Sequence, residues 1–216
     1  MGECFETAYE ELPQEIAIFP LPGVILLPRA QLPLNIFERR YLALADFALS
    51  SSRLIGMVQP KGENIEGEVY ATGCAGRICS FAETDDGRYL VTLKGVSRFK
   101  VAEELPLSNG GFRRVRADWE PYKADFEEAE MTDLCRDTMM GTLRQYLDKM
   151  NMFCDKWETI RSIECEKLVS TLAVVCPFEP KEKQALLEAP DLRARARLLQ
   201  ALLENATRDE TGTACH

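Results

Sequence analysis

The sequence predicts an α+β protein, in which a β-barrel of about seven short strands and one short helix precedes a helical subdomain. From residue 16 to residue 122, short apolar or alternating segments are separated by glycine and proline, a pattern typical of strands joined by tight turns. From residue 125 onward, apolar residues recur at three- and four-residue steps, which is typical of amphipathic helices. Because the chain has 216 residues and 46% of them are hydrophobic, it can bury a sizeable core.

The first half is expected to close on itself as a barrel. A connection framed by two prolines leads into residues 34–37, after which leucine and alanine at helical spacing predict a helix over residues 39–49. Asp85-Asp86-Gly87 stands between two alternating segments and predicts a hairpin turn rather than a paired-acid site. So many short strands favour closure, since closure leaves no exposed edge. The expected strands span residues 16–19, 24–27, 54–59, 70–81, 88–93, 96–101 and 112–119.

The second half is expected to form helices of different lengths. The longest covers residues 127–151, and the next starts at residue 157 and stops before Pro177, because proline disfavours helical geometry in the residue before it. A short helix follows over residues 180–188, and Asp191 is the expected N-cap of the last helix. The expected organisation is a barrel over residues 12–122, a helical subdomain over residues 123–206 and a disordered tail over residues 207–216.

Charge and hydropathy indicate a cytoplasmic protein that binds neither nucleic acid nor membranes. The formal net charge is -9, which disfavours long-range attraction to nucleic acid and to anionic lipid. No apolar run approaches the roughly 20 residues that a membrane-spanning helix needs. Residues 1–11 are acidic, whereas a secretory signal is basic and then apolar, so the cytoplasm is the expected location.

Neither the cysteines nor the single histidine predict a metal or cofactor site. The eight cysteines are expected to be free thiols, since disulfide frameworks belong to small secreted chains. Cys74 and Cys79 lie an odd number of residues apart in an extended segment, so their side chains point to opposite faces and cannot easily share a metal. His216 is the last residue and cannot supply the fixed imidazole of Ser-His-Asp or Cys-His catalysis. Ser-Lys, paired-carboxylate and lysine chemistry survive, but no such site is recognisable, so we predict no catalytic residues and no cofactor.

Two segments of the first half carry a family resemblance. They read Phe-Pro-Leu-Pro-Gly-Val-Ile-Leu-Leu-Pro at residues 19–28 and Leu-Pro-Leu-Asn-Ile-Phe-Glu-Arg-Arg-Tyr at residues 32–41. They resemble the opening of the substrate-binding domain found at the N-terminus of Lon-type ATP-dependent proteases. Further matches follow in the family's order at residues 55–58, 73–78, 93–99, 182–189 and 191–195, so that the resemblance covers roughly residues 12–204.

The resemblance implies a PUA-like β-barrel followed by a helical subdomain. This agrees with the strand-like pattern of the first half of the chain and the helical pattern of the second half. In full-length Lon proteases this domain captures unfolded or tagged substrates, a separate ATPase module unfolds them, and a Ser-Lys dyad cleaves them. These 216 residues contain no GxxxxGK[ST] phosphate loop. The resemblance therefore implies a stand-alone, non-catalytic module that binds unfolded or tagged polypeptide, or a protein of the protease system, as an adaptor or substrate sensor.

Two regions are candidates for binding a polypeptide, because each offers apolar side chains that a client chain can cover. One is the barrel surface near residues 20–37, where the family resemblance is densest, and the other is a groove between barrel and helices. In the first region Leu34 and Ile36 share one strand face and Asn35 and Phe37 share the other, so at most one pair faces solvent. The candidate polypeptide-binding residues are Leu21, Leu34, Phe37, Trp157 and Phe178.

The same region contains a candidate structural motif at the start of the first helix. Glu38 is expected to form an ion pair with Arg40 or Arg39 that fixes the helix start, a role that is favoured over ligand capture. The motif comprises Ile36, Phe37, Glu38, Arg40 and Tyr41.

Two other functions stay open as alternatives. The first is an ATP-independent peptidase related to Lon, which the absence of a recognisable dyad argues against. The second is an RNA-binding barrel that uses Arg113, Arg114 and Arg116, of which the last two share a strand face. The acidic composition argues against RNA, and a solvated β-face is the simpler interpretation of these arginines.

Overall fold

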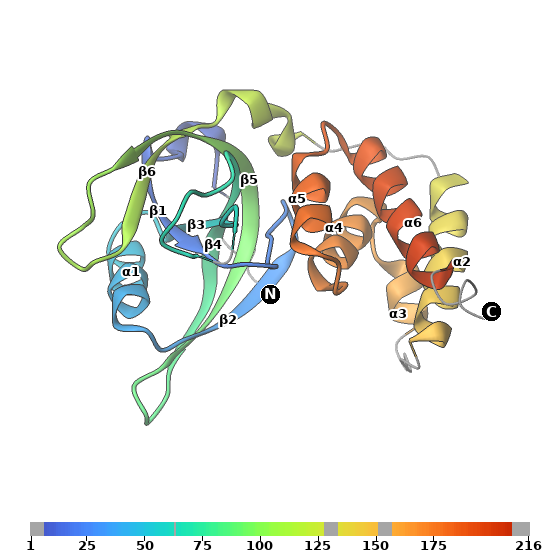
Figure 1. The fold of residues 1–216 in the computed structure, drawn as a ribbon, viewed down its shortest axis with the longest axis horizontal. Helices are drawn as coiled ribbons and strands as arrows, with labels where there is room; N and C mark the ends of the chain where they lie inside the picture. The colour runs from blue at the N-terminus through green and yellow to red at the C-terminus, as the bar shows by residue number, and fades with distance from the viewer. Residues whose placement is uncertain (1–6, 63, 128–133, 151–156, 209–216) are drawn as a thin grey trace, which may run out of the picture. The chain divides into compact units, whose positions relative to one another are not determined.

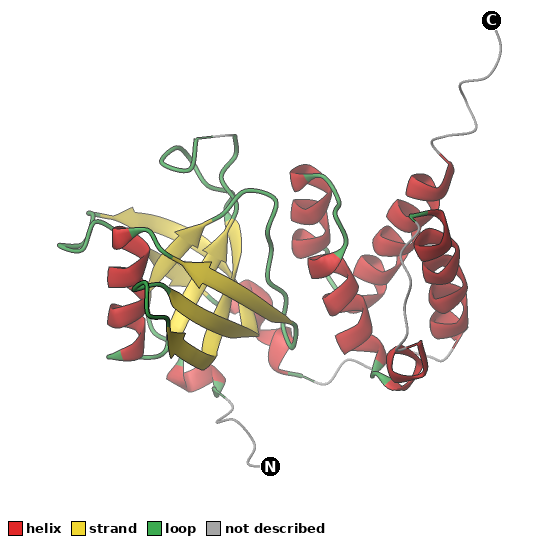
Figure 2. Cartoon of the chain, turned by 90° about the horizontal axis from the view of Figure 1, so that it is seen from below, coloured by secondary structure: helices red, strands yellow, loops and turns green. Residues whose placement is uncertain are grey.

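The computed structural model describes residues 7–62, 64–127, 134–150 and 157–208. The chain divides into two compact units, Met1–Glu128 and Ala129–His216. The strands gather in the first unit together with helix α1 and two 3-10 helices, and the second unit is helical (Figures 1 and 2). The predicted α+β class is confirmed.

The first unit contains a mixed six-stranded sheet in the order β2-β5-β4-β3-β1-β6. β1 and β3 are parallel and the other neighbours are antiparallel. Because β6 pairs with both β1 and β5, five of the strands form a closed ring, and β2 is added to β5 outside it. The strands are β1 (Glu15–Pro20), β2 (Gln31–Ile36), β3 (Leu54–Val58), β4 (Thr72–Glu83), β5 (Tyr89–Leu105) and β6 (Arg113–Asp118).

The structure differs from the predicted strands in three places. β2 (Gln31–Ile36) is absent from the seven expected strands. Residues 24–27 are not a strand, although Ile25, Leu26 and Leu27 are almost fully buried. Residues 88–93 and 96–101 are not separate strands either, because β5 continues through both. The predicted hairpin turn between β4 and β5 is confirmed, with Gly87 at a φ of 76° and its N–H bonded to the carbonyl of Thr84 at 2.9 Å.

A compact apolar cluster fills the centre of the barrel. Phe99 and Ile18 are fully buried, and the ring of Phe99 packs against that of Trp119 with centroids 5.3 Å apart. The short 3-10 helices η1 (Tyr9–Glu11) and η2 (Glu120–Phe126) lie before β1 and after β6 in the chain. Helix α1 (Arg39–Leu49) coincides with the predicted helix and buries Tyr41, Leu44, Ala45 and Ala48.

The second unit comprises α2 (Leu134–Lys149), α3 (Trp157–Ser162), α4 (Cys165–Val175), α5 (Pro180–Glu188) and α6 (Leu192–Arg208). The predicted helix over residues 157–175 is two helices, and α4 ends before Cys176, whose extended backbone is the geometry that a following proline favours. Helix α5 and the Asp191 cap are as predicted, since the Asp191 carboxylate accepts the N–H of Ala194 at 2.7 Å.

Within the described residues, the predicted helix over residues 127–151 corresponds to α2 (Leu134–Lys149). Glu127 has an extended backbone as the C-cap of η2, while residues 128–133 and 151 lie outside the described part of the chain. Of the predicted tail, residues 207 and 208 belong to α6 and the others are not described. Among the described helices, none combines the length and apolarity that a bilayer crossing requires.

Candidate functional site

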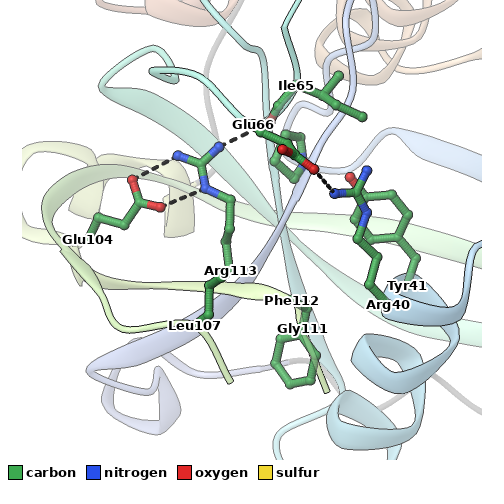
Figure 3. Close-up of a pocket in the computed structure, with 10 residues that line it drawn as sticks. Arg40, Tyr41, Ile65, Glu66, Glu104, Leu107, Gly111, Phe112 and Arg113 are labelled. Carbon is green, nitrogen blue, oxygen red and sulfur yellow. Dashed lines mark hydrogen bonds and ion pairs between the residues drawn. The ribbon is translucent and has the colours of Figure 1, made fainter. Parts of the chain in front are cut away.

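Two adjoining cavities lie beside α1 in the barrel unit. Their volumes are about 320 Å³ and about 430 Å³, and Leu107 and Phe112 line both of them. We call the pair the α1 groove; Figure 3 shows its first cavity. The first cavity is also lined by Pro20, Arg40, Tyr41, Ile65, Glu66, Glu104, Gly111 and Arg113, and the second by Ala43, Phe47, Ser108, Asn109, Gly110 and Arg114.

The α1 groove has an apolar floor and exposed apolar walls. Phe112 is 5% exposed and packs against Phe47 at a centroid distance of 5.4 Å, and the Tyr41 ring stacks on Phe19 at 4.0 Å. Burial raises the pKa of the Tyr41 phenol, so that Tyr41 stays neutral at physiological pH. Leu107 is 66% exposed and Phe47 42%, so both side chains offer apolar surface at the mouth of the cavities.

Leu107 and Phe112 belong to the loop between β5 and β6, and a tight turn in this loop positions both of them in the α1 groove. Gly111 has a φ of 76°, a left-handed conformation that favours glycine. Its N–H bonds to the carbonyl of Ser108 at 2.9 Å, and the Ser108 hydroxyl accepts the N–H of Phe112 at 3.1 Å. The turn therefore returns Phe112 to the barrel while Leu107 stays outside.

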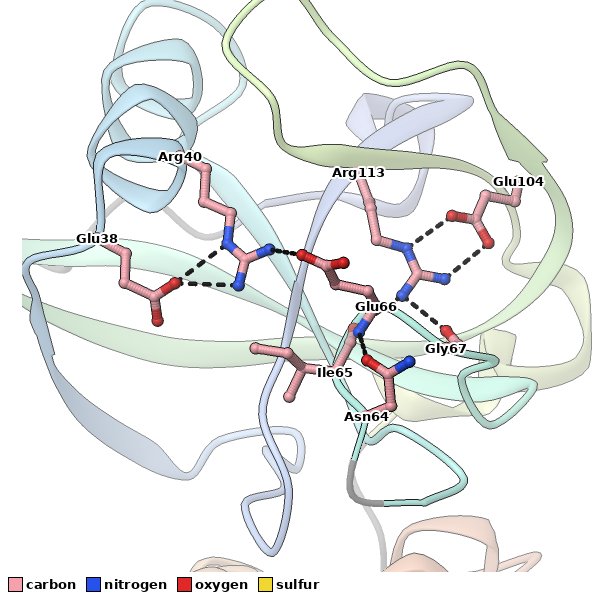
Figure 4. Close-up of polar contacts among 8 residues, drawn as sticks. All are labelled: Glu38, Arg40, Asn64, Ile65, Glu66, Gly67, Glu104 and Arg113. Carbon is pink, nitrogen blue, oxygen red and sulfur yellow. Dashed lines mark hydrogen bonds and ion pairs between the residues drawn. The ribbon is translucent and has the colours of Figure 1, made fainter.

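Two arginines form the charged end of the groove (Figure 4). Arg40 donates to the Glu38 carboxylate from Nε and Nη2, at 3.1 and 3.0 Å, and to Glu66 from Nη1 at 3.1 Å. Arg113 forms a two-point contact with Glu104, at 2.6 and 2.7 Å. The Arg113–Glu104 pair has the planar, bidentate geometry that carboxylates favour, whereas Arg40 directs Nε and Nη2 at one and the same oxygen of Glu38.

The predicted ion pair between Glu38 and Arg40 is present at the start of α1. Ile36 is buried at the end of β2, and Tyr41 is buried under the Arg40 guanidinium, which lies 4.8 Å from the ring centroid. The motif thus orients Arg40 in addition to organising the helix start. Phe37 points away from this core, with 63% of its side chain exposed.

The other candidate binding residues have different surroundings. Leu34 is buried, which fits core packing and excludes it from a binding surface. Leu21 directly follows β1 in the chain and is half-buried. Neither they nor Phe37 line the α1 groove. Trp157 begins α3 and Phe178 lies between α4 and α5, both half-buried in the helical unit.

Within the described residues, no cluster of histidine, cysteine and acidic side chains fits a metal ion. Burial raises the pKa of the Cys176 thiol to about 11, so that this group is protonated and a poor nucleophile at neutral pH. Burial also lowers the pKa of Lys183, whose ammonium donates to the carbonyl of Val174 at 3.0 Å. These contacts fit a structural role for both residues.

The arginines of β6 each face a glutamate, which reduces the positive potential that RNA would meet. We therefore expect RNA affinity to be weak, with a dissociation constant above about 10 µM at physiological salt, and to fall steeply as salt rises. Fluorescence anisotropy with a labelled single-stranded RNA at two salt concentrations tests this. Tight binding that is lost on Arg114→Ala plus Arg116→Ala would contradict it. The pairs are Arg113–Glu104 at 2.6 Å, Arg114–Glu15 at 3.5 Å and Arg116–Glu103 at 3.3 Å.

Residues 15–205 match the family described as the ATP-dependent protease La (LON) substrate-binding domain. The chain belongs to this family. Among curated relatives, Lon protease 2 of Myxococcus xanthus is 26% identical over 90% of the chain, and the Lon protease of Desulfosudis oleivorans is 30% identical over 86%. The chain spans about a quarter of the length of these relatives, 24% and 23%.

Solved structures show the same fold for the LON-family chain. The Lon N-terminal domain protein from Xanthomonas campestris superimposes with a TM-score of 0.62 at 22% identity, over 88% of the chain and 97% of that structure. The N-terminal domain of the Mycobacterium avium complex Lon protease gives 0.63 at 19%, over 91% of the chain and 99% of that structure. The predicted family resemblance is confirmed over almost its whole extent.

Proposed function

We propose that this LON-family chain binds unfolded or tagged polypeptide in the α1 groove, as a substrate-recognition module without a catalytic step of its own. Membership of the family supports recognition of protease substrates. The α1 groove is proposed as the binding site because Leu107, which lines both cavities, is largely exposed to solvent. An apolar client side chain that enters the groove covers Leu107 and Phe47 and removes their surface from water.

The same proposal places the protein in the cytoplasm, as an adaptor or substrate sensor of a protease system, with a barrel of the PUA-like type. The net charge of -9, which disfavours attachment to anionic lipid surfaces, supports this part of the proposal. No observation in the described residues favours the peptidase or the RNA-binding alternative over polypeptide recognition.

Leu107→Ser is expected to weaken binding of an unfolded model protein about tenfold, because a leucine that becomes buried on binding contributes about 1.5 kcal/mol or more. Since Leu107 is 66% exposed in the free protein, the free energy of unfolding should change by about 0.5 kcal/mol or less. Binding is measured by fluorescence anisotropy with labelled, reduced and carboxymethylated casein, and stability by urea unfolding.

Phe37→Ser is the matched control, since Phe37 is equally exposed but lies outside the α1 groove. It is expected to leave both affinity and stability near wild type. If Phe37→Ser weakens binding and Leu107→Ser does not, the client docks near residues 20–37 and the choice of groove is wrong. Gel analysis of the same samples should show intact casein, and cleavage that survives rigorous purification would support the peptidase alternative.

A further inference from the structure

The loop between β3 and β4 inserts an apolar and an acidic residue of its own into the α1 groove. Ile65 and Glu66 both line the first cavity, and the Glu66 carboxylate accepts a hydrogen bond from Arg40 Nη1 at 3.1 Å. Figure 4 shows Glu66 between the two arginines of the groove. A segment of the chain itself therefore occupies the charged end of the groove.

The backbone of this segment is bound in the way that a peptide ligand is bound. Arg113 Nη1 donates to the carbonyl oxygens of Ile65 and Gly67, at 3.1 and 3.0 Å. The Asn64 side chain accepts the N–H of Glu66 at 3.0 Å and keeps the turn compact. One arginine thus contacts the backbone of the segment and the other contacts its side-chain carboxylate.

The position that Glu66 occupies on Arg40 is a ready binding point for a carboxylate. Arg40 donates hydrogen bonds from Nε and Nη2 to the Glu38 carboxylate, so that Nη1 is the nitrogen that donates to Glu66. The Glu66 side chain is 73% exposed, whereas that of Arg40 is 29% exposed. Ion pairs of such exposure are weak, so an incoming carboxylate can replace Glu66 at little cost.

We propose that Ile65 and Glu66 act as an internal competitor, and that the α1 groove prefers client segments in which an apolar residue precedes Glu or Asp. This inference rests on the proposed function, because it concerns the same groove. The client's side-chain carboxylate takes the place of Glu66 on Arg40, its apolar neighbour takes the place of Ile65, and the displaced loop leaves the cavity.

The test uses two labelled peptides with blocked ends that differ in one residue, Leu-Glu or Leu-Gln within a Gly/Ser sequence. Glu66→Gln is expected to bind the Leu-Glu peptide about two- to fivefold more tightly than wild type, because the competitor has lost its charge. It should also bind the Leu-Gln peptide more tightly than wild type, by a similar factor, because either peptide must displace the same loop. Both proteins should bind the Leu-Glu peptide more tightly than the Leu-Gln peptide, because only the glutamate carboxylate can replace that of Glu66 on Arg40. Glu68→Gln is the matched control, since Glu68 is two residues away but pairs with Lys61 at 2.9 Å and does not line the cavity; it should behave as wild type with both peptides.

The outcomes separate this inference from the proposed function. If wild type and Glu66→Gln bind neither peptide nor carboxymethylated casein, both proposals are wrong. If casein binds but Glu66→Gln binds both peptides no more tightly than wild type does, internal competition is wrong and the proposed function stands. If each protein binds the Leu-Glu and Leu-Gln peptides with equal affinity, the preference for an acidic residue is wrong. A Leu-Gln peptide with a free C-terminus that binds more tightly than the blocked Leu-Glu peptide would show that the groove takes a chain end, and would likewise overturn the preference for an internal acidic residue.

Discussion

Asp125→Ala is expected to destabilise the barrel unit by about 3–5 kcal/mol, because it leaves the Arg98 guanidinium buried without its main counter-charge. The side chains of Arg98 and Asp125 are only 4% and 8% exposed. The Asp125 carboxylate accepts hydrogen bonds from Arg98 Nη2 at 2.7 Å and from the Arg98 backbone N–H at 2.9 Å. A typical domain has a free energy of unfolding of about 5–15 kcal/mol, so the loss is a large fraction of the total.

The measurement is urea unfolding followed by the fluorescence of Trp119, in a Trp157→Phe background, because these are the two tryptophans of the chain. Glu103→Gln is the control, since it removes an exposed ion pair of the same strand and should cost less than about 1 kcal/mol. Arg98→Met plus Asp125→Ala should recover part of the loss, because no buried charge is left alone. Equal effects of Asp125→Ala and Glu103→Gln would show that the buried pair contributes no more than a surface pair.

This ion pair gives a physical reason for one of the segments on which the family resemblance rests. Residues 93–99 include Arg98, which ties β5 to η2, and Phe99, which fills the centre of the barrel. The Arg98 guanidinium also lies 4.4 Å from the centroid of the Tyr122 ring, which belongs to η2 as well. The matched segment therefore concerns architecture rather than the binding of a client.

Local signals in the sequence were sufficient for several elements. Helices α1 and α5 coincide with the predicted residues 39–49 and 180–188. Leucine and alanine at helical spacing identified α1, and a proline in the first turn identified the start of α5. The Asp85-Asp86-Gly87 turn was also predicted, since its glycine takes the left-handed conformation that the turn requires.

The strand boundaries in the barrel are predicted wrongly where the apolar pattern of a segment results from packing against a distant part of the chain. The sequence predicts separate strands over residues 88–93 and 96–101, although β5 runs through Gly95 between them without interruption. The apolar residues 24–27 predict a strand, whereas in the structure they are buried as an irregular segment. Both errors have one origin, since the segment after residue 24 approaches β5 at Gly95, where its hydrogen bonds join Ala30 and Arg29 to Gly95.

The candidate site could be predicted only in part. The continuous Ile-Phe-Glu-Arg-Arg-Tyr segment draws attention to Arg40 and Tyr41, but it predicts a structural role for them rather than a place in a binding site. Leu107 and Glu66 were missed, since they come from loops far apart in the chain and meet α1 only through the closure of the barrel. An apolar leucine in a loop that is otherwise rich in Ser, Asn and Gly was the available signal for Leu107.

Gly95→Ala is expected to destabilise the barrel unit by about 3 kcal/mol or more, because a Cβ atom at this position would lie 1.9 Å from the carbonyl oxygen of Leu27. The obstacle is backbone, which cannot rotate away as a side chain can. The two hydrogen bonds that hold the approach, Arg29 N–H to the Gly95 carbonyl and Gly95 N–H to the Ala30 carbonyl, are both 2.9 Å and would have to lengthen. The loss is measured by the same Trp119 unfolding assay.

Gly62→Ala is the matched control in the same unit, because a Cβ atom there has no neighbour within 4 Å. It should change the free energy of unfolding by less than about 1 kcal/mol, through the entropy of the unfolded chain alone. A Gly95→Ala protein as stable as the Gly62→Ala protein would mean that residues 24–30 can move away from β5 at no cost. In that case the close approach to Leu27 would not be the reason for a glycine in the middle of a seventeen-residue strand.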